Sequence, residues 1–345
     1  MKILLIGNFA PPYEEENLHN ITLLGKLKED GHECTVINIS KTPSRDSSFI
    51  NASSNIGYFF TLLRHSLSKD VIHFLTKGYL RVGLLKLMLA IFAGTLLKTK
   101  KILTIHSEFF SVLGQMRSPF GGTQTLYTSF FLADKILFTD KDTYNVAKMY
   151  RKKSNFELVP SFIYLPEDIE RFDTTRTAKI NTMRNVVFFA NIKHPSFLFD
   201  ILSEVISKHS LFDETGIVIV LSDKPSLKLQ HALEDTSGPF KDRLVFIEYD
   251  DVRSALKIFS RAHIILKPMS CDGTTFFESF AMCAKKAVRS GRYIYFPGGL
   301  VFVKEGSAAN LCADIVTTLI NGQSDSEWVS HMEDPYEKII KIYEA

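Results

Sequence analysis

Lys2-Ile3-Leu4-Leu5-Ile6-Gly7-Asn8 opens the chain and decides its fold class. The run is short and apolar, and the loop sequence Ala10-Pro11-Pro12 follows it. Such a run is typical of a strand buried in a parallel sheet, whose carboxyl end opens into a loop. Apolar residues recur at helical spacing over 17–28, and a second apolar run follows at Cys34–Ile39. The opening of the chain therefore predicts one strand–helix–strand unit.

The same alternation continues through two successive series, which predicts two doubly wound α/β domains. A chain of 345 residues exceeds the size at which one core usually stops growing. A polar connector separates the series, and a new apolar strand starts at Asn185. We expect Rossmann-like domains that face each other across a cleft, where open α/β sheets bind ligands. The expected bounds are 1–165, a linker over 166–184, a second domain over 185–328, and a C-terminal helix over 329–345 that packs back on the first domain.

Composition and charge narrow the classes of function. The net charge of +3 is too small to indicate nucleic acid. The cysteines are widely spaced and include no Cys-x-x-Cys pair, which indicates free thiols in a reducing, cytoplasmic compartment and no zinc site. They are Cys34, Cys271, Cys283 and Cys312.

One basic cluster has two interpretations. It is either a solvated face or a weak peripheral contact with anionic lipid at the inner face of the membrane. Its residues are Lys98, Lys100, Lys101, Arg151, Lys152 and Lys153. The apolar stretch Val82–Leu97 contains Lys86 and is too short for a membrane span, so we expect a buried helix there.

The segment Leu266–Ala281 carries the clearest chemical signal. A strand ends near Lys267, an Asp272-Gly273 turn follows, and the pattern predicts a helix over Thr275–Lys285. A helix N-terminus preceded by small residues offers free backbone N–H groups to a phosphate. Asp272 and Thr274 are equally suited to capping that helix, so spacing alone favours neither role.

This segment resembles the retaining glycosyltransferases of family 4, which have the GT-B fold. Lys267-Pro268-Met269, Asp272-Gly273 and Phe280-Ala281-Met282-Cys283 match three consecutive motifs of that family in order. The opening strand, Gly31-His32-Glu33-Cys34-Thr35-Val36 and the strand ending at His106 match others, so the resemblance covers nearly the whole chain.

The resemblance implies a nucleotide sugar as substrate, with uridine diphosphate the expected carrier. It implies transfer with retention to a saccharide or lipid-linked acceptor in cell-surface polysaccharide synthesis, without a metal ion or other cofactor. His106 would contact the donor sugar, and the acceptor would lie near Gly7 and Asn8. The remaining donor-site residues are Lys193, Asn191, Tyr249, Asp250, Lys267, Asp272, Gly273, Thr274, Thr275 and Glu278.

Three departures from the family pattern bear on activity. Glu14-Glu15-Glu16 stands where the family has glycines that let backbone amides approach phosphate, and carboxylates there repel an anion unless they turn outward. The segment after Ala190 supplies Lys193 but no arginine. The acid that would bind the ribose aligns with Phe280, and Glu278 lies two residues earlier, on another face of the helix.

Competing functions remain open at this stage. His106 is either a site residue or a polar side chain satisfied within the fold, and the same holds for His73. The chain is either an active glycosyltransferase or a catalytically impaired relative that acts as a binding partner. A nicotinamide oxidoreductase is the third candidate, but the chain lacks a Gly-x-Gly-x-x-Gly fingerprint after its first strand.

Overall fold

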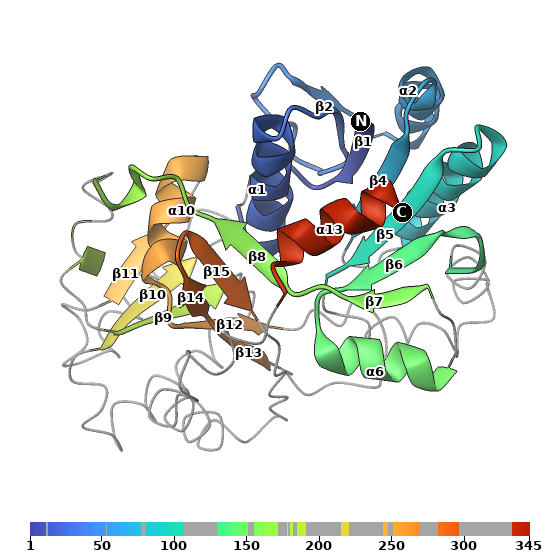
Figure 1. Cartoon of the computed structure of the whole chain (residues 1–345). Helices are drawn as coiled ribbons and strands as arrows, with labels where there is room; N and C mark the ends of the chain where they lie inside the picture. The colour runs from blue at the N-terminus through green and yellow to red at the C-terminus, as the bar shows by residue number, and fades with distance from the viewer. Residues whose placement is uncertain are drawn as a thin grey trace. The chain divides into compact units, whose positions relative to one another are not determined.

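The structure is a computed structural model, and it describes residues 1–11, 13–52, 54–76, 81–106, 130–150, 155–171, 178, 180–181, 185–190, 215–220, 244–247, 251–268, 282–296 and 333–345. The chain divides into two compact units (Figure 1). The first unit comprises Met1–Tyr164 together with Glu333–Ala345, and the second comprises Leu165–Met332. The linker over 166–184 stays a prediction.

A parallel sheet of seven strands forms the centre of the first unit. Its strand order, β3-β2-β1-β4-β5-β6-β7, is that of a doubly wound fold, in which the chain reverses direction across the sheet between β1 and β4. This confirms the α/β class predicted from the opening strand. The strands are β1 (Lys2–Gly7), β2 (Glu33–Asn38), β3 (Phe49–Asn51), β4 (Val71–Thr76), β5 (Lys100–Ile105), β6 (Lys135–Phe138) and β7 (Phe156–Leu158).

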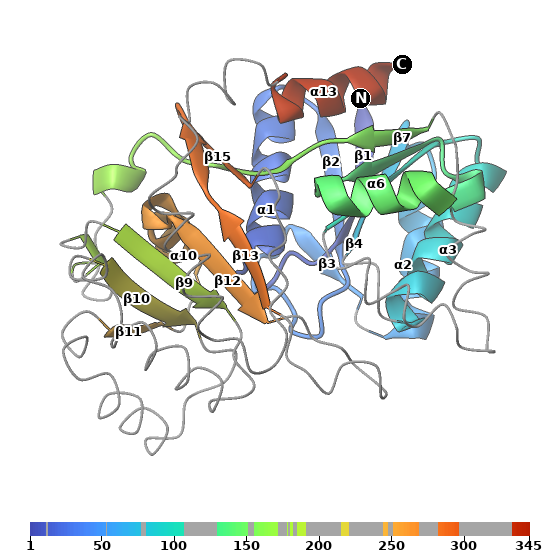
Figure 2. The same ribbon diagram turned by 90° about the horizontal axis from the view of Figure 1, so that it is seen from below.

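Helices cover both faces of this sheet. Ile72 and Phe74 of β4 belong to a core shared with α2 and α3, whereas His73, which alternates with them along the strand, contacts α13. Helices α2 and α3 therefore lie on one face of the sheet and α13 lies on the other, as Figures 1 and 2 show. The helices of this unit are α1 (Glu15–Glu29), α2 (Asn55–Ser66), α3 (Arg81–Leu96), α6 (Lys141–Tyr150) and α13 (Pro335–Glu344).

The C-terminal helix α13 is tied to the sheet by a buried polar cluster. Nδ1 of His73 lies 2.5 Å from the hydroxyl oxygen of Tyr343, and Nε2 lies 2.7 Å from Oγ1 of Thr104. The ammonium of Lys100 donates to the backbone oxygen of Tyr343 at 3.3 Å. His73 therefore lies within strand β4, and both of its ring nitrogens have partners inside the fold.

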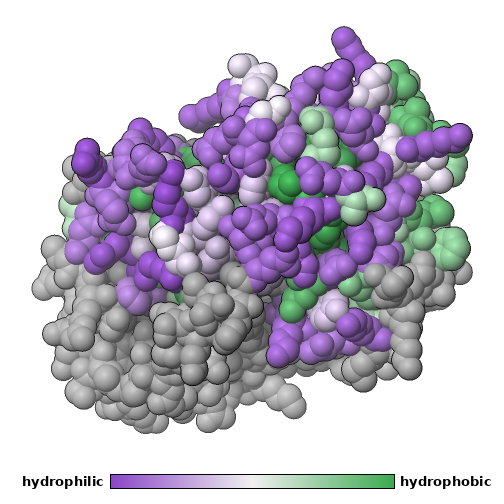
Figure 3. All heavy atoms as spheres, in the orientation of Figure 1, coloured by the Kyte–Doolittle hydropathy of each residue, from purple (hydrophilic) through white to green (hydrophobic). Residues whose placement is uncertain are grey.

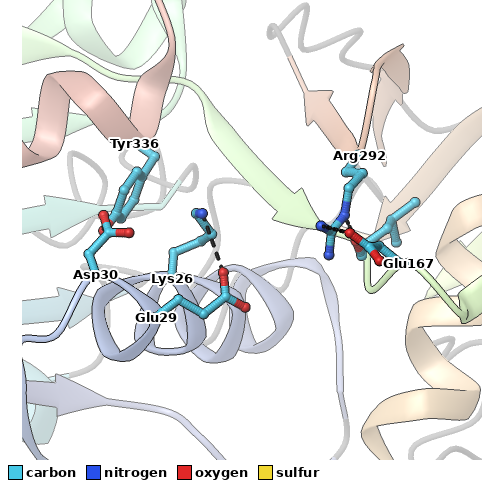
Figure 4. A network of polar contacts seen from close by, with 7 residues as sticks. Lys26, Glu29, Asp30, Glu167, Arg292 and Tyr336 are labelled. Atoms are coloured by element: carbon cyan, nitrogen blue, oxygen red, sulfur yellow. Dashed lines mark hydrogen bonds and ion pairs between the residues drawn. The ribbon is translucent and has the colours of Figure 1, made fainter.

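A second set of contacts holds the start of α13 against α1. The side chain of Asp334 caps the helix by accepting from the amide of Tyr336 at 2.8 Å. The hydroxyl of Tyr336 donates to Asp30, and the ammonium of Lys26 lies 5.4 Å from the centre of the Tyr336 ring (Figure 4). Thirteen C-terminal residues are thus anchored at both ends of α13 to the unit that the N-terminus builds.

Burial of His73 makes the stability of the first unit depend on pH. Desolvation lowers the pKa of His73 to about 3, so the folded unit holds the ring neutral while the unfolded chain protonates it near its ordinary value of 6.5. The unfolded state therefore binds more protons, and stability falls as the pH drops from about 6.5 toward about 3. We expect His73→Gln to remove about 1.4 kcal/mol per pH unit of this dependence. Thermal unfolding of parent and variant across mildly acidic pH measures it, and equal slopes would contradict it.

The second unit contains a smaller sheet with a related strand order. It reads β11-β10-β9-β12-β13, so the first strand in sequence again lies beside the fourth. The first four strands are parallel, and β13 pairs antiparallel with β12. The strands are β9 (Asn185–Ala190), β10 (Thr215–Val220), β11 (Leu244–Ile247), β12 (Ile264–Pro268) and β13 (Met282–Lys286), and α10 (Val252–Arg261) joins β11 to β12.

Shorter elements complete the described parts. In the first unit, β8 (Ser161–Tyr164) contacts α1. In the second, η1 (Ile169–Arg171) packs on α10, and β14 (Val288–Ser290) forms a hairpin with β15 (Tyr293–Phe296). The hairpin turns at Gly291, whose φ of +56° disfavours residues with a Cβ atom.

Two expectations from the sequence are wrong. The predicted helix over Thr275–Lys285 is incompatible with β13, because Met282–Lys286 pairs residue for residue with Ile264–Pro268. Intrinsic helix propensity is a weak prior, and here the backbone groups at the edge of β12 compete with it. The helix predicted at Val82–Leu97 is present as α3, but the expectation that it is buried is wrong on one side, because Phe92 and Leu96 retain 55% and 68% of their accessible surface.

Candidate functional site

The carboxyl edge of the first sheet brings β1 and β4 together at the point where the strand order reverses. Gly7 ends β1 there and lies against Leu75 of β4. A Cβ atom at Gly7 would lie 3.0 Å from the backbone oxygen and 3.1 Å from the Cβ of Leu75. The glycine therefore lets the two strands close together, and the side chain of Asn8 follows at the edge where ligands bind in doubly wound folds.

Gly7→Ala should destabilise the first unit, because the neighbouring atoms are backbone and Cβ and cannot move aside independently. We expect a loss of about 1 to 3 kcal/mol. Gly25→Ala is the matched control, since no atom lies within 4 Å of a Cβ at that position in α1. There, alanine should stabilise the helix by about 0.5 to 1 kcal/mol. Thermal unfolding of both variants tests the pair, and shifts of the same sign would contradict the packing argument.

His106 follows β5 directly and is held by Asn20 of α1. Its backbone N–H donates to the oxygen of Thr76 at 2.9 Å, which extends the pairing of β4 and β5. Its Nε2 lies 3.3 Å from Oδ1 of Asn20, while the amide nitrogen of Asn20 donates to the backbone oxygen of Asn8 at 3.1 Å. Because Asn20 uses its NH2 group on Asn8, its oxygen faces the ring, and Nε2 of His106 is the donor.

His19 packs beside His106 and is neutral near pH 7. The two ring centres lie 5.0 Å apart at an interplanar angle of 73°, and His19 also packs edge-on against Phe162 of β8. Its Nδ1 lies 3.0 Å from the backbone oxygen and 3.2 Å from the backbone nitrogen of Phe162, so the tautomer decides which bond forms. Burial lowers the pKa of His19 to about 4, against smaller opposite effects of the hydrogen bond to the Phe162 backbone and of Glu16.

The acidic segment of the first unit, Glu14–Glu16, forms the start of a helix. Helix α1 begins at Glu15, and Glu14, Glu15 and Glu16 are all buried rather than turned toward solvent. Carboxylates in the first turn complement the positive end of the helix dipole. A phosphate at the same end of the helix would meet these carboxylates as like charges. The N-terminus of α1 is therefore unsuited to binding a diphosphate.

In the second unit, β9 and β12 mark the corresponding point of reversal. They run parallel and side by side, with Phe189 opposite Leu266, and they end at Ala190 and Pro268. Lys267 is the penultimate residue of β12 and pairs with Cys283 of β13. The chain thus leaves two neighbouring strands at the edge where such sheets bind ligands.

Most of the predicted donor-site residues lie outside the described part of the chain. Asp250 immediately precedes Asp251, whose side chain caps α10 by accepting from the amide of Ser254 at 2.7 Å. The structure brings Gly7, Asn8 and His106 together in the first unit and fixes the strand register of Lys267 in the second. The predicted residues that it does not describe are Asn191, Lys193, Tyr249, Asp250, Asp272, Gly273, Thr274, Thr275 and Glu278.

Two residues that lie beside His106, His19 and Asn20, were not predicted from the sequence. Their signal was available, because Glu16, His19 and Asn20 follow the i, i+3, i+4 spacing that places residues on one side of a helix. Among the described residues no group of His, Cys, Asp and Glu is arranged to hold a metal ion. The absence of a cofactor stays a prediction.

Comparisons with known proteins give only distant likenesses. No family model matches the chain, and no curated protein does. Among solved structures, HepE of Anabaena in complex with UDP-glucose is similar with a TM-score of 0.47 and 12% identity, over 77% of this chain and 73% of that one. MnaA of S. aureus with UDP gives 0.47 and 15% over the same shares, and an α-glucosyltransferase with UDP and DNA gives 0.45 and 12% over 76% and 71%. The α/β class of the chain rests on its own strand orders.

Proposed function

We propose that the chain is a glycosyltransferase that moves a sugar from a nucleoside diphosphate, with UDP the expected carrier, to a saccharide or lipid-linked acceptor. One observation carries the proposal: β9 and β12 end side by side where the strand order of the second sheet reverses. Lys193 follows β9 by three residues, and Asp272-Gly273 follows β12 by four. The two segments that resemble donor-binding motifs therefore start from neighbouring strands.

The donor diphosphate is assigned to this edge of the second sheet. Lys267, Lys193 and the backbone amides of Gly273 and Thr274 would stabilise the charge that develops on the leaving diphosphate. Asp272 and Thr275 would order the segment that follows β12, and Asn191, which follows β9, would line the diphosphate site. Tyr249 and Asp250 would hold the base, and Glu278 is the acid available for the ribose hydroxyls.

The first unit is assigned the sugar and the acceptor. His106 is fixed by Asn20, so its imidazole needs no reorientation when substrate arrives. Gly7 and Asn8 lie on the same edge and share Asn20 as a contact. Following the resemblance, the reaction would proceed with retention and without a metal ion, and it would serve the synthesis of a cell-surface polysaccharide.

A catalytically impaired binding protein is the second candidate, and two observations favour it. Glu14–Glu16 are buried at the helix end where the resembling family has glycines. Strand β13 begins at Met282, within the segment in which that family has the helix bearing its ribose-binding acid. Both features would weaken the binding of a nucleotide sugar, while the two sheets of the fold are kept.

Donor turnover separates the two candidates. The purified chain is incubated with a panel of UDP-, GDP- and ADP-sugars, and release of the nucleoside diphosphate is measured with and without oligosaccharide acceptors. A glycosyltransferase turns over one donor in preference to the others, and Lys267→Ala slows that reaction more than Lys41→Ala, a change of an exposed lysine in the first unit. No turnover of any donor, with weak or absent binding of UDP, favours the binding protein and contradicts the glycosyltransferase. Turnover of one donor contradicts the binding protein.

A further inference from the structure

Helices α2 and α3 carry an apolar surface on the side that faces away from the sheet. On α2 the exposed apolar residues recur at intervals of three, one and three residues, which places them on one face of the helix. On α3 they recur at intervals of seven and four residues. We call this set the outer face: Ile56, Phe59, Phe60 and Leu63 of α2, and Leu85, Phe92 and Leu96 of α3, with Leu67 and Leu97 just beyond the helix ends.

Besides the outer face, each of the two helices has a second apolar side that is buried against the sheet. Tyr58 and Leu62 of α2 and Leu84, Leu87 and Ile91 of α3 are buried in the core of the first unit. Both helices are therefore apolar on two sides, whereas a helix at the surface of a soluble domain is normally polar on its outer side. Figure 3 shows hydrophobic residues gathered over α2 and α3 at the right-hand edge of the molecule. A contiguous exposed patch of this kind marks an interaction surface.

The two helices form one platform. The hydroxyl of Tyr58 in α2 donates to the backbone oxygen of Lys86 in α3 at 2.8 Å, and the ammonium of Lys86 donates to the oxygen of Ala52 at 3.2 Å. Each helix connects two parallel strands of the sheet, so α2 and α3 run in the same direction and end at the same edge of the unit.

The charges of the two helices indicate the occupant, and an exposed carboxylate, that of Asp70, also lies at that edge. Neither α2 nor α3 contains an aspartate or a glutamate. Arg64, in the last turn of α2, and Lys98, just after α3, are exposed, and Leu67 and Leu96 are exposed beside them in the sequence. Apolar side chains next to exposed cations, with no carboxylate on either helix, suit a membrane whose headgroups are anionic. A symmetric dimer through the same face would bring the cations of both copies into one interface.

We propose that the outer face docks the first unit on the surface of an anionic lipid bilayer, with Phe60 and Phe92 entering the headgroup region. The docking is peripheral, because none of the described helices is long and apolar enough to cross a membrane. Among the described residues of the basic cluster expected from the sequence, Lys98 is the one that contributes. Lys101 is buried and paired with Asp134 at 2.9 Å, Lys100 is bonded to Tyr343, and residues 151–153 lie outside the described part. The proposal concerns the first unit alone and does not depend on the donor.

Co-sedimentation with lipid vesicles tests the proposal. One set of vesicles is phosphatidylcholine, and the other contains about 30 mol% phosphatidylglycerol. We expect the parent to sediment with the anionic vesicles and to be released by salt. Phe60→Ser/Phe92→Ser should bind at least about ten-fold more weakly, because the buried apolar area drives interfacial binding. Both side chains are exposed, so this variant should keep the thermal stability of the parent.

Two charge-reversal variants distinguish the effect of cations beside the outer face on vesicle binding from the effect of net charge alone. Arg64→Glu/Lys98→Glu should lose at least about ten-fold in affinity for the anionic vesicles. Lys41→Glu/Arg45→Glu changes the net charge equally at two exposed sites outside α2 and α3, and should bind as the parent does. Equal binding by all variants overturns the proposal. So does a parent that ignores vesicles and forms a dimer that Phe60→Ser/Phe92→Ser dissociates, since the face is then an interface between two copies.

Discussion

His106→Ala should lower the turnover number for sugar transfer by about 10²- to 10³-fold, the range seen when one donor to a developing charge is removed. The effect is large because the imidazole is already oriented: its Nε2 is held by Asn20, and its backbone is bonded to Thr76. The affinity for UDP should stay within about two-fold of the parent, because the diphosphate is assigned to the second unit and a two-fold change is about 0.4 kcal/mol. Steady-state kinetics and calorimetry on one preparation measure both quantities.

Asn20→Ala tests whether His106 acts from a fixed position. Loss of the Asn20 contacts frees the ring without removing it, so turnover should fall by about ten-fold, less than in His106→Ala. Asn155→Ala is the control, because Asn155 also donates its amide to a backbone oxygen, that of Ala133 at 3.0 Å, but between other elements. Both variants should lose about 1 kcal/mol of stability. If Asn155→Ala slows turnover as much as Asn20→Ala, the slowing reflects stability and His106 has no special position.

Removal of the last thirteen residues should prevent the first unit from folding. A chain ending at Met332 lacks α13, whose buried side chains include Tyr336, Ile339, Ile342 and Tyr343. Each large buried side chain contributes about 2 to 5 kcal/mol. Their combined loss is comparable with the whole stability of a domain, about 5 to 15 kcal/mol. Hydrogen exchange of the β4 and β5 amides in the soluble fraction measures the result, with full-length protection expected to disappear.

Two single substitutions in α13 test whether the stabilisation comes from the buried side of the helix. Tyr343→Phe removes only the hydroxyl that contacts His73, and should cost about 1 to 2 kcal/mol. Lys341→Ala lies on the exposed side of the same helix, where it pairs with Glu333, and should leave the unfolding midpoint of the parent unchanged. Native protection of β4 in the truncated chain would show that α13 is dispensable for the first unit.

Many of the parallel strands could be predicted from the sequence to within a residue or two, although β3 was not predicted. Short apolar runs such as Lys2–Ile6 and Leu244–Ile247 are typical of strands buried in a parallel sheet, and both segments are strands. Strand β13 could not be predicted, because it exists only through pairing with β12, and its own residues favour a helix. The exposure of one side of α3 could not be predicted either, because an apolar run does not show which of its sides packs against the rest of the protein.

The candidate site was predictable at the ends of strands and not within helices. His106 and Gly7 follow apolar runs that end at a sheet edge, so topology alone places them near one another. His19 and Asn20 reach the same point from α1, and only the packing of that helix on the sheet shows that they face His106. The burial of Glu14–Glu16 has the same origin, because it depends on where α1 begins.

Titration of the full-length chain with UDP by calorimetry tests the central claim most directly, namely that the carboxyl edge of β9 and β12 binds a nucleoside diphosphate. The account predicts a dissociation constant below about 1 mM for the parent. It predicts a loss of at least about ten-fold for Lys267→Ala, because that lysine is assigned to the diphosphate. Lys41→Ala should bind UDP as the parent does. Binding weaker than millimolar by the parent, or equal binding by Lys267→Ala and the parent, would contradict the account.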